Sequence, residues 1–242
     1  SGKTTTLYAA MAEIDTTKKN ILTIEDPVEY AIGGISQVQV NAKKGLTFAS
    51  GLRSFLRQDP DVMMVGEIRD LETAEVAIRA ALTGHLVFST VHTNDAASTI
   101  TRMVDQGVEP YLVASSIVLI IAQRLVRTVC AHCKVVGPIT DEWEAKLKKV
   151  GMTKEELGGE IAYGPGCDEC FHSGYAGRTA IYEFLPITEK IRTLVMDGAS
   201  ATEIKREQSA RGYQTLRSDG REKVKLGQTT PDEVLRVTQL DI

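Results

Sequence analysis

Three short apolar runs, each followed at once by polar side chains, constrain the fold of this 242-residue chain more than any other feature. They occupy residues 20–25, 62–65 and 86–90. Runs of this length, rich in β-branched and other apolar residues, are typical of buried strands. Helical periodicity over 46–56 and 72–82 alternates with them, and such alternation predicts a parallel sheet flanked by helices. We therefore expect an α/β fold.

The polar side chains that follow these runs are carboxylates and a histidine. Glu25 and Asp26 end the first run, with Glu29 nearby, Glu67 follows the second, and His92 follows the third. Ligands of open α/β sheets bind at the carboxyl ends of the strands. The carboxylates are therefore candidate catalytic groups for a metal-bound phosphate or its attacking water, and His92 for sensing a terminal phosphate. A solvated acidic turn is the alternative for residues 25–29, and a structural role the alternative for a lone histidine.

The first residues match the second half of the phosphate-binding pattern G-x-x-x-x-G-K-[ST]. In such a loop, backbone N–H groups cradle phosphate, the lysine reaches the terminal phosphates and the hydroxyl binds Mg²⁺. Lys3 and Thr4 would take the last two roles, with Ser1, Gly2 and Thr5 beside them. Gly-Lys-Thr alone also occurs in flexible termini, so this interpretation depends on the strand ends. A helical spacing follows the lysine, which predicts an amphipathic helix starting there, with an apolar face made of Leu7, Ala10, Met11 and Ile14.

The second nucleotide motif is atypical. In enzymes with such a phosphate-binding loop, the second motif usually ends in Asp then Glu. The Asp holds Mg²⁺ through water, and the Glu polarises the attacking water. Here Gly66 precedes Glu67. We therefore assign the water-orienting role to Glu67 and expect Glu25 or Asp26 to help with the metal. His85, at the start of the third run, is a weaker candidate than His92.

The four cysteines form two Cys-x-x-Cys pairs, Cys130 with Cys133 and Cys167 with Cys170. Two such pairs can supply the four thiolates of a tetrahedral, structural Zn²⁺ site. Free or redox-active thiols are the first alternative, and disulfides the second.

Composition narrows the class of protein further. Hydrophobic residues make up 43% and charged residues 25%, as in ordinary globular proteins. A net charge of −4 lacks the basic footprint of a nucleic-acid binder, so we expect no nucleic-acid partner. The apolar run at 117–122 is far shorter than the roughly 20 residues that span a bilayer, and no leader opens the chain. We expect neither a membrane-spanning protein nor a secreted precursor.

These motifs resemble the traffic ATPases that drive bacterial type II secretion and type IV pilus assembly, and the resemblance runs the length of the chain. The family motifs it matches are the end of a Walker A loop at 1–6, an Asp box at 23–29, an atypical Walker B at 57–70, a His box at 83–94 and a basic segment at 123–127. A Gly before the Walker B Glu is normal in this family.

The resemblance implies a RecA-like P-loop core at 1–127, a tetracysteine module at 128–178 and a small C-terminal helical domain at 179–242. It implies a homo-hexamer that binds ATP and Mg²⁺ between subunits and moves an inner-membrane platform protein. Such a motor is cytoplasmic, at the inner face of the inner membrane, and reaches the membrane only through its partners. Family members carry further domains before the loop, and only half of the phosphate-binding loop is present here, so we expect a fragment that binds nucleotide weakly or not at all by itself.

By the same resemblance, Glu67 is the catalytic glutamate, and the γ-phosphate is surrounded by Glu25, Asp26, His85 and His92. Arg124 and Arg127 would contact nucleotide or a neighbouring subunit, with surface charge as the alternative for Arg127. The cysteine module occurs in secretion and pilus-extension motors and is generally missing from retraction motors. Two other functions stay open: a zinc-bearing scaffold without turnover, and a DNA-translocating motor, against which the net charge argues.

Overall fold

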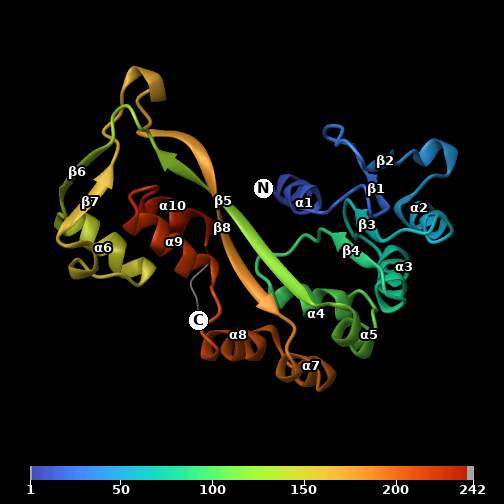
Figure 1. Cartoon of the computed structure of the whole chain (residues 1–242). Coiled ribbons are helices and arrows are strands. Elements are labelled where there is room, and N and C mark those ends of the chain that lie inside the picture. The colour runs from blue at the N-terminus through green and yellow to red at the C-terminus, as the bar shows by residue number, and fades with distance from the viewer. Residues whose placement is uncertain (1, 239–242) are drawn as a thin grey trace. The chain divides into compact units, whose positions relative to one another are not determined.

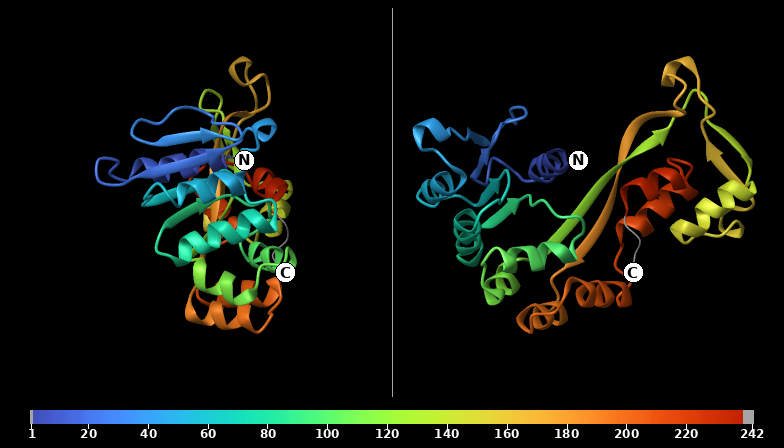
Figure 2. Two further views of the ribbon diagram at one scale, coloured as in Figure 1. Left: turned by 90° about the vertical axis from the view of Figure 1, so that its right-hand side faces the viewer. Right: turned by 180° about the vertical axis from the view of Figure 1, so that it is seen from behind.

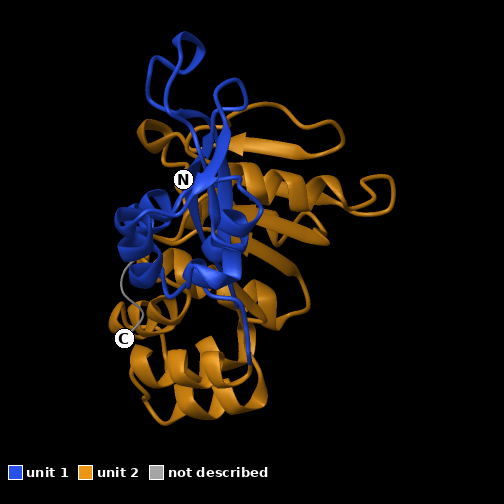
Figure 3. Cartoon of the chain, turned by 90° about the vertical axis from the view of Figure 1, so that its left-hand side faces the viewer, with its two compact units in different colours: residues 1–2, 121–184, 212–242 blue, residues 3–120, 185–211 orange. Residues whose placement is uncertain are grey.

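The structure is a computed structural model that describes residues 2–238 of the chain. These residues form two compact units (Figure 3). Unit 2 contains residues 3–120 and 185–211, and unit 1 contains residues 121–184 and 212–238 together with Gly2. The sequence analysis divides the chain into three consecutive domains, with boundaries after residues 127 and 178, and this division stays a prediction. The compact units divide the last segment differently, because residues 185–211 belong with the first part of the chain.

Unit 2 is built on a four-stranded sheet, as expected of an α/β fold (Figure 1). Its strands are β1 (Ile21–Glu25), β2 (Ser36–Gln39), β3 (Val62–Val65) and β4 (Leu86–Ser89), in the spatial order β2-β1-β3-β4. All three neighbouring pairs are parallel. The three predicted strands are thus present, and their carboxyl ends share one edge of the sheet.

Burial differs along the sheet in a way the sequence did not predict. Every residue of β1 and β3 is buried, because each has a strand on both sides. Strand β4 ends the order of described strands, and Leu86 is 44% exposed. The expectation of a buried strand at 86–90 was therefore wrong about burial.

Helices cover this sheet and continue beyond it, and their first turns are set by local side chains. Thr47, Asp70 and Ser200 each accept a hydrogen bond from a backbone N–H in the first turn of the following helix, as good N-caps do. The helices of unit 2 are α1 (Lys3–Ala12), α2 (Phe48–Phe55), α3 (Leu71–Leu82), α4 (Ala97–Asp105), α5 (Pro110–Ser116), α7 (Glu189–Met196) and α8 (Ala201–Ala210), with a 3-10 turn η1 (Ala42–Lys44).

Helix α1 begins at Lys3, as the sequence predicted, and Leu7, Met11 and the following Ile14 pack in the core cluster beside the sheet, as their spacing indicated. Tyr8 and Met11 are its buried residues, and they pack with Ile21, Val62 and Met64 of the sheet. Ala10, which the apolar spacing had placed on the buried face, is exposed. The larger aromatic ring of Tyr8 takes the position against the sheet instead.

The described part of unit 1 contains two two-stranded sheets and three helices. Strands β5 (Leu119–Val129) and β8 (Tyr175–Pro186) pair and run side by side in the right-hand view of Figure 2. Strand β6 (Val135–Pro138) pairs antiparallel with β7 (Glu160–Tyr163). The remaining elements are α6 (Asp141–Val150), α9 (Leu216–Lys225), α10 (Pro231–Val237), and the short turns η2 (Glu155–Leu157) and η3 (Asp168–Cys170). Within residues 2–238, none of the helices combines the length and apolarity needed to cross a membrane.

A buried carboxylate ties α10 to β5 in unit 1. The side chain of Glu233 is 1% exposed. Its oxygens accept hydrogen bonds from the backbone N–H of Arg127 at 2.8 Å and from the guanidinium groups of Arg127 and Arg236 at 2.7 Å. The guanidinium carbon of Arg127 also lies 4.2 Å from the ring centre of Tyr175 on β8. This cluster joins two strands and a helix around one negative charge.

Ionisation of Glu233 stabilises the folded chain. Burial opposes its ionisation, but the hydrogen bonds from Arg236 and Arg127 outweigh this and lower its pKa from 4.5 to about 2. Because the pKa is lower in the folded state, the stabilisation is present above the unfolded pKa and is lost as the pH falls toward 2. At 1.36 kcal/mol per pKa unit it amounts to at most about 3 kcal/mol.

We predict that Glu233→Gln lowers the free energy of unfolding at pH 7 by about 2–3 kcal/mol, because two guanidinium groups then face a neutral amide. The difference from the unmodified chain should shrink between pH 4.5 and pH 2. Urea unfolding followed by circular dichroism at stepped pH measures this. The control is Glu189→Gln, whose side chain is 89% exposed and should change stability by less than about 0.5 kcal/mol. A difference for Glu233→Gln that stays constant across that pH range would contradict the assignment.

Candidate functional site

The carboxyl edge of the unit 2 sheet gathers a lysine, a glutamate and a histidine. Lys3, at the start of α1, donates from Nζ to the backbone oxygen of Val91 at 2.9 Å. Glu67 lies two residues beyond β3, and its Oε2 is 2.9 Å from Nε2 of His92, which follows β4. The structure thus brings together three residues that the sequence analysis selected from segments far apart in the chain.

The tips of β3 and β4 are held in this arrangement by their own backbones. Thr90 donates from its hydroxyl to the backbone oxygen of Gly66 at 2.7 Å. In return, the backbone N–H of Ile68 donates to the oxygen of Thr90 at 2.9 Å. These two bonds extend the parallel pairing past the ends of the strands, so Glu67 and His92 leave the sheet side by side.

Glu67 is placed to act as a charged carboxylate. It is 9% exposed, and its Oε1 is in an ion pair with Arg69. The contact with Arg69 lowers the pKa of Glu67; burial opposes the shift and the His92 contact adds to it. His92, in contrast, has a side chain that is 71% exposed. The pair therefore combines a buried, negatively charged Glu67 with an imidazole of His92 that is accessible to solvent.

Arg69 is the functional candidate that sequence reasoning missed. It lies two residues after Glu67, and Asp26 at the end of β1 contributes to raising its pKa after the larger effect of Glu67. The sequence did contain a sign of it, since Arg69 is a cation between the acidic residues Glu67 and Asp70, but the sequence analysis assigned it no role. Its guanidinium supplies a positive charge at the same sheet edge.

Glu25 occupies the same edge but is enclosed by protein groups. It is 2% exposed; its Oε2 accepts from the hydroxyl of Tyr8, and its Oε1 from Thr23 at 2.5 Å and Gln37 at 3.2 Å. Burial and this hydrogen bond raise the pKa of Tyr8 to about 12, so its hydroxyl stays a donor. The neighbouring acids, Asp26 and Glu29, are exposed. The geometry thus gives Glu25 a structural role, and leaves Asp26 and Glu29 as the accessible carboxylates of this segment.

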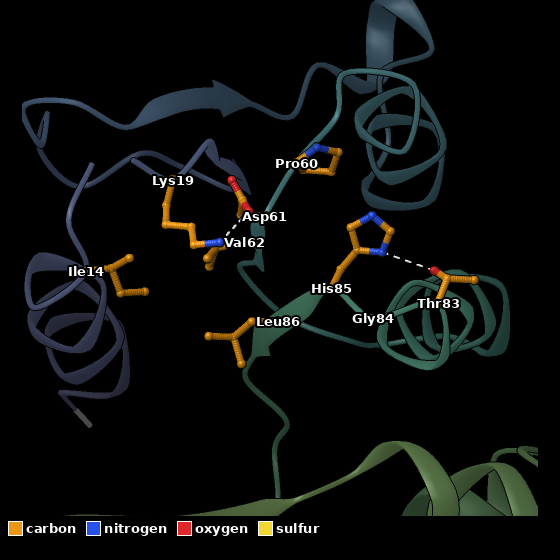
Figure 4. A pocket seen from close by; sticks show the side chains of 9 residues that line it. All are labelled: Ile14, Lys19, Pro60, Asp61, Val62, Thr83, Gly84, His85 and Leu86. Carbon is orange, nitrogen blue, oxygen red and sulfur yellow. Dashed lines mark hydrogen bonds and ion pairs between the residues drawn. The ribbon is translucent and has the colours of Figure 1, made fainter. Parts of the chain in front are cut away.

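His85 lies at the opposite edge of the sheet from His92. It precedes β4, and its Nδ1 is 2.9 Å from the backbone oxygen of Ala80 and 3.0 Å from the hydroxyl of Thr83. With the ion pair of Lys19 and Asp61 it lines a pocket of about 440 Å³ (Figure 4). Within one chain, the structure therefore does not bring His85 together with Glu67 and His92.

The other predicted nucleotide ligands lie at the start of the chain and on β5. Thr4 and Thr5 are in the first turn of α1, and Gly2 precedes it with a φ of +76°, a conformation that suits glycine. Ser1 lies outside the described residues. Arg124 and Arg127 belong to β5, in unit 1, where Arg127 forms the ion pair with Glu233 described above. This contact favours a structural role for Arg127.

The four cysteine sulfurs converge on one point in unit 1. All four Sγ atoms lie within 4.8 Å of one another, and the cysteines are unbonded to each other. Individual Sγ–Sγ distances are 4.0 Å for Cys130 and Cys167, 3.9 Å for Cys133 and Cys170, and 3.7 Å for Cys167 and Cys170. A tetrahedron with zinc–sulfur bonds of about 2.3 Å has edges of about 3.8 Å. The donor set therefore fits a closed Zn²⁺ site.

Backbone groups prepare this cluster for a metal. Burial opposes ionisation of Cys170, but N–H groups of Cys167 and Gly174 donate to its sulfur at 3.2 and 3.3 Å, and its pKa falls to about 6. The loop closes tightly, since a Cβ added to Gly164 would lie 2.3 Å from the backbone oxygen of Gly174. Only glycine allows these two segments to approach so closely.

Comparisons with known proteins agree with these features. A family model described as "Type II/IV secretion system protein" matches residues 1–236. The chain is 51% identical to the type II secretion system protein HxcR of Pseudomonas aeruginosa, over 99% of this chain and 46% of that protein. It is 51% identical to the type IV pilus assembly ATPase PilB of Thermus thermophilus, over 98% of this chain and 26% of that protein. The chain thus spans half or less of the length of these relatives.

Among solved structures, the chain resembles that of the pilus retraction motor PilT with bound ADP. The TM-score is 0.69 and the identity 31%, over 98% of this chain and 58% of that one. The parallel α/β sheet and its flanking helices are therefore shared with a motor of known structure. From the family model and these similarities together, this chain belongs to the type II/IV secretion system protein family.

Proposed function

We propose that this chain is the ATP-hydrolysing part of a motor that powers type II protein secretion or type IV pilus assembly. The observation that carries the proposal is that Lys3, Glu67 and His92 lie at the same edge of the sheet. Glu67 contacts His92, and Lys3 contacts the backbone of the neighbouring Val91. A lysine at a helix N-terminus binds phosphate, and a buried, charged glutamate can orient the attacking water. The names of the relatives, a secretion system protein and a pilus assembly ATPase, support the same chemistry.

In this proposal each residue of the edge has one task. Lys3 and the N–H groups of the first turn of α1 bind the terminal phosphates, and the hydroxyl of Thr4 holds Mg²⁺, which neutralises phosphate charge when bound. Glu67 accepts a proton from, or orients, the attacking water. His92, exposed beside it, contacts the terminal phosphate. Gly2 and Thr5 flank the phosphate site, and Asp26 and Glu29 remain the accessible carboxylates near the metal.

The assembly and its place in the cell are also proposals, drawn from the family resemblance. We infer a homo-hexamer that acts in the cytoplasm at the inner face of the inner membrane and drives a platform protein there. Arg124 contacts nucleotide or a neighbouring subunit. His85, on the other sheet edge, would reach a nucleotide only across a subunit boundary. The four cysteines hold one structural Zn²⁺ that fixes the loop 164–174.

We predict that Glu67→Gln lowers the kcat of ATP hydrolysis by about 10²- to 10⁴-fold, because the amide keeps the shape but loses the charge and basicity. The binding of ATP should change much less. The measurement is phosphate release by the natural protein that carries this sequence. Glu72→Gln, on the exposed start of α3, is the matched control and should hydrolyse ATP at the original rate. Equal rates for both variants would rule out Glu67 as the catalytic base.

We predict about one Zn²⁺ per chain after expression in zinc-replete medium. Gly164→Ala should lower this content several-fold, because its Cβ would collide with the backbone of Gly174. The control is Gly137→Ala, whose Cβ would make an ordinary contact of 3.4 Å with the ring of Tyr163 and should leave the metal content unchanged. Inductively coupled plasma mass spectrometry measures the ratio. Far less than one Zn²⁺ in the unmodified chain would contradict the site.

The pathway is decided in the source bacterium. Lys3→Ala in the natural gene should abolish phosphate binding, and secreted proteins and surface pili are then assayed side by side. Loss of secretion with intact pili identifies a type II secretion motor, and loss of pili alone a pilus-assembly motor. If neither changes while the variant protein accumulates normally, the motor proposal fails.

A further inference from the structure

Helix α8, from the C-terminal part of the chain, contacts the segment that carries His92. Helix α8 packs on α4, and its Ile204 is completely buried. Lys205, the next residue, places its Nζ 3.0 Å from Oδ2 of Asp95. Asp95 lies three residues after His92, in the segment 90–96 between β4 and α4. All these residues belong to unit 2.

Asp95 connects three parts of this unit. Its Oδ2 meets Lys205, and its Oδ1 accepts a hydrogen bond from the backbone N–H of Ser98, in the first turn of α4, at 2.8 Å. Its side chain is 13% exposed, whereas that of Lys205 is 45% exposed. Burial opposes ionisation of Asp95, but the Ser98 and Lys205 contacts outweigh it and lower its pKa. The start of α4, the His92 segment and α8 thus share one carboxylate.

The position of His92 depends on how this segment is anchored. The segment has no regular secondary structure, and the imidazole itself is largely exposed. Lys3 holds the segment at the backbone oxygen of Val91, and the hydroxyl of Thr93 lies 2.7 Å from that of Thr99 on α4. The contact of Asp95 with Lys205 anchors the segment to α8, one of the C-terminal helices.

We propose that Lys205 is a positioning residue for His92. By holding Asp95, it fixes the C-terminal end of the segment and so keeps the imidazole against Glu67. This inference rests on the proposed function, because it gives α8 a part in the hydrolysis at this edge. A partly exposed ion pair contributes little to overall stability, so its loss should leave the fold intact. A small displacement of a catalytic group, in contrast, slows a reaction markedly.

The first test needs no activity. The chain has four histidines, whose ring signals in ¹H–¹⁵N spectra are assigned with His→Gln variants. Glu67→Gln provides the reference, because it removes the carboxylate beside His92. Lys205→Met should move the His92 signals in the same direction, and Lys205→Arg should restore them. Lys190→Met, an exposed lysine on α7, is the control and should leave them in place.

The second test measures hydrolysis by the natural protein that carries this sequence. Lys205→Met should lower kcat by about fivefold with KM unchanged within about twofold, since the loss concerns the arrangement of catalytic groups. Lys205→Arg should keep kcat within about twofold, and Lys190→Met should have no effect. Asp95→Asn combined with Lys205→Met should be no slower than the slower single variant, as expected for two residues acting through one contact.

The two tests separate the inference from the function on which it rests. If the unmodified protein does not hydrolyse ATP, the proposed function fails, and the histidine spectra still decide the role of Lys205. If Lys205→Met leaves the His92 signals where Lys190→Met leaves them, the inference is wrong. It is also wrong if Lys205→Arg loses as much activity as Lys205→Met.

Discussion

The parallel pairing of β3 with β4 is the constraint on which the candidate site depends. Val65 lies opposite Ser89 in this register, so residues 66–67 and 90–92 leave the sheet together. The contact of Glu67 with His92 follows from that register, and the Thr90 bonds to the tip of β3 preserve it. A shift of one residue would turn these side chains to opposite faces of the sheet. The chemistry of the edge is thus set by backbone pairing before any ligand is present.

The sequence predicted the parts of the site that depend on local pattern. The short apolar runs are strands with polar tips, because strands covered on both faces are mostly apolar. The two Cys-x-x-Cys pairs converge as their spacing suggested. The paired strands β5 and β8 went unrecognised. Their side chains alternate irregularly between exposed and buried positions, and the segment 123–127 was interpreted by its charge.

Contacts between residues distant in the chain supply what sequence reasoning could not. Glu25 is a candidate catalytic acid in the sequence, and the structure adds its contacts with Tyr8 and Gln37, neither of which is adjacent in sequence. The family resemblance placed His85 and His92 around one phosphate, whereas within one chain β4 separates them and they lie at opposite edges of the sheet. Arg127 was a candidate nucleotide ligand, and its partner Glu233 is 106 positions away. Within unit 1, that partnership and the cysteine cluster hold the same end of β5, since Cys130 directly follows the strand.

The central claim is that nucleotide binds at the carboxyl edge of the sheet, where Lys3, Glu67 and His92 meet. The most direct measurement is a crystal structure of the natural protein with Mg²⁺ and a non-hydrolysable ATP analogue. We predict that the terminal phosphate contacts the Lys3 ammonium and lies within hydrogen-bond reach of His92, with Glu67 facing the position of the attacking water. Nucleotide bound instead at the opposite edge, in the pocket of Lys19 and His85, would contradict this account.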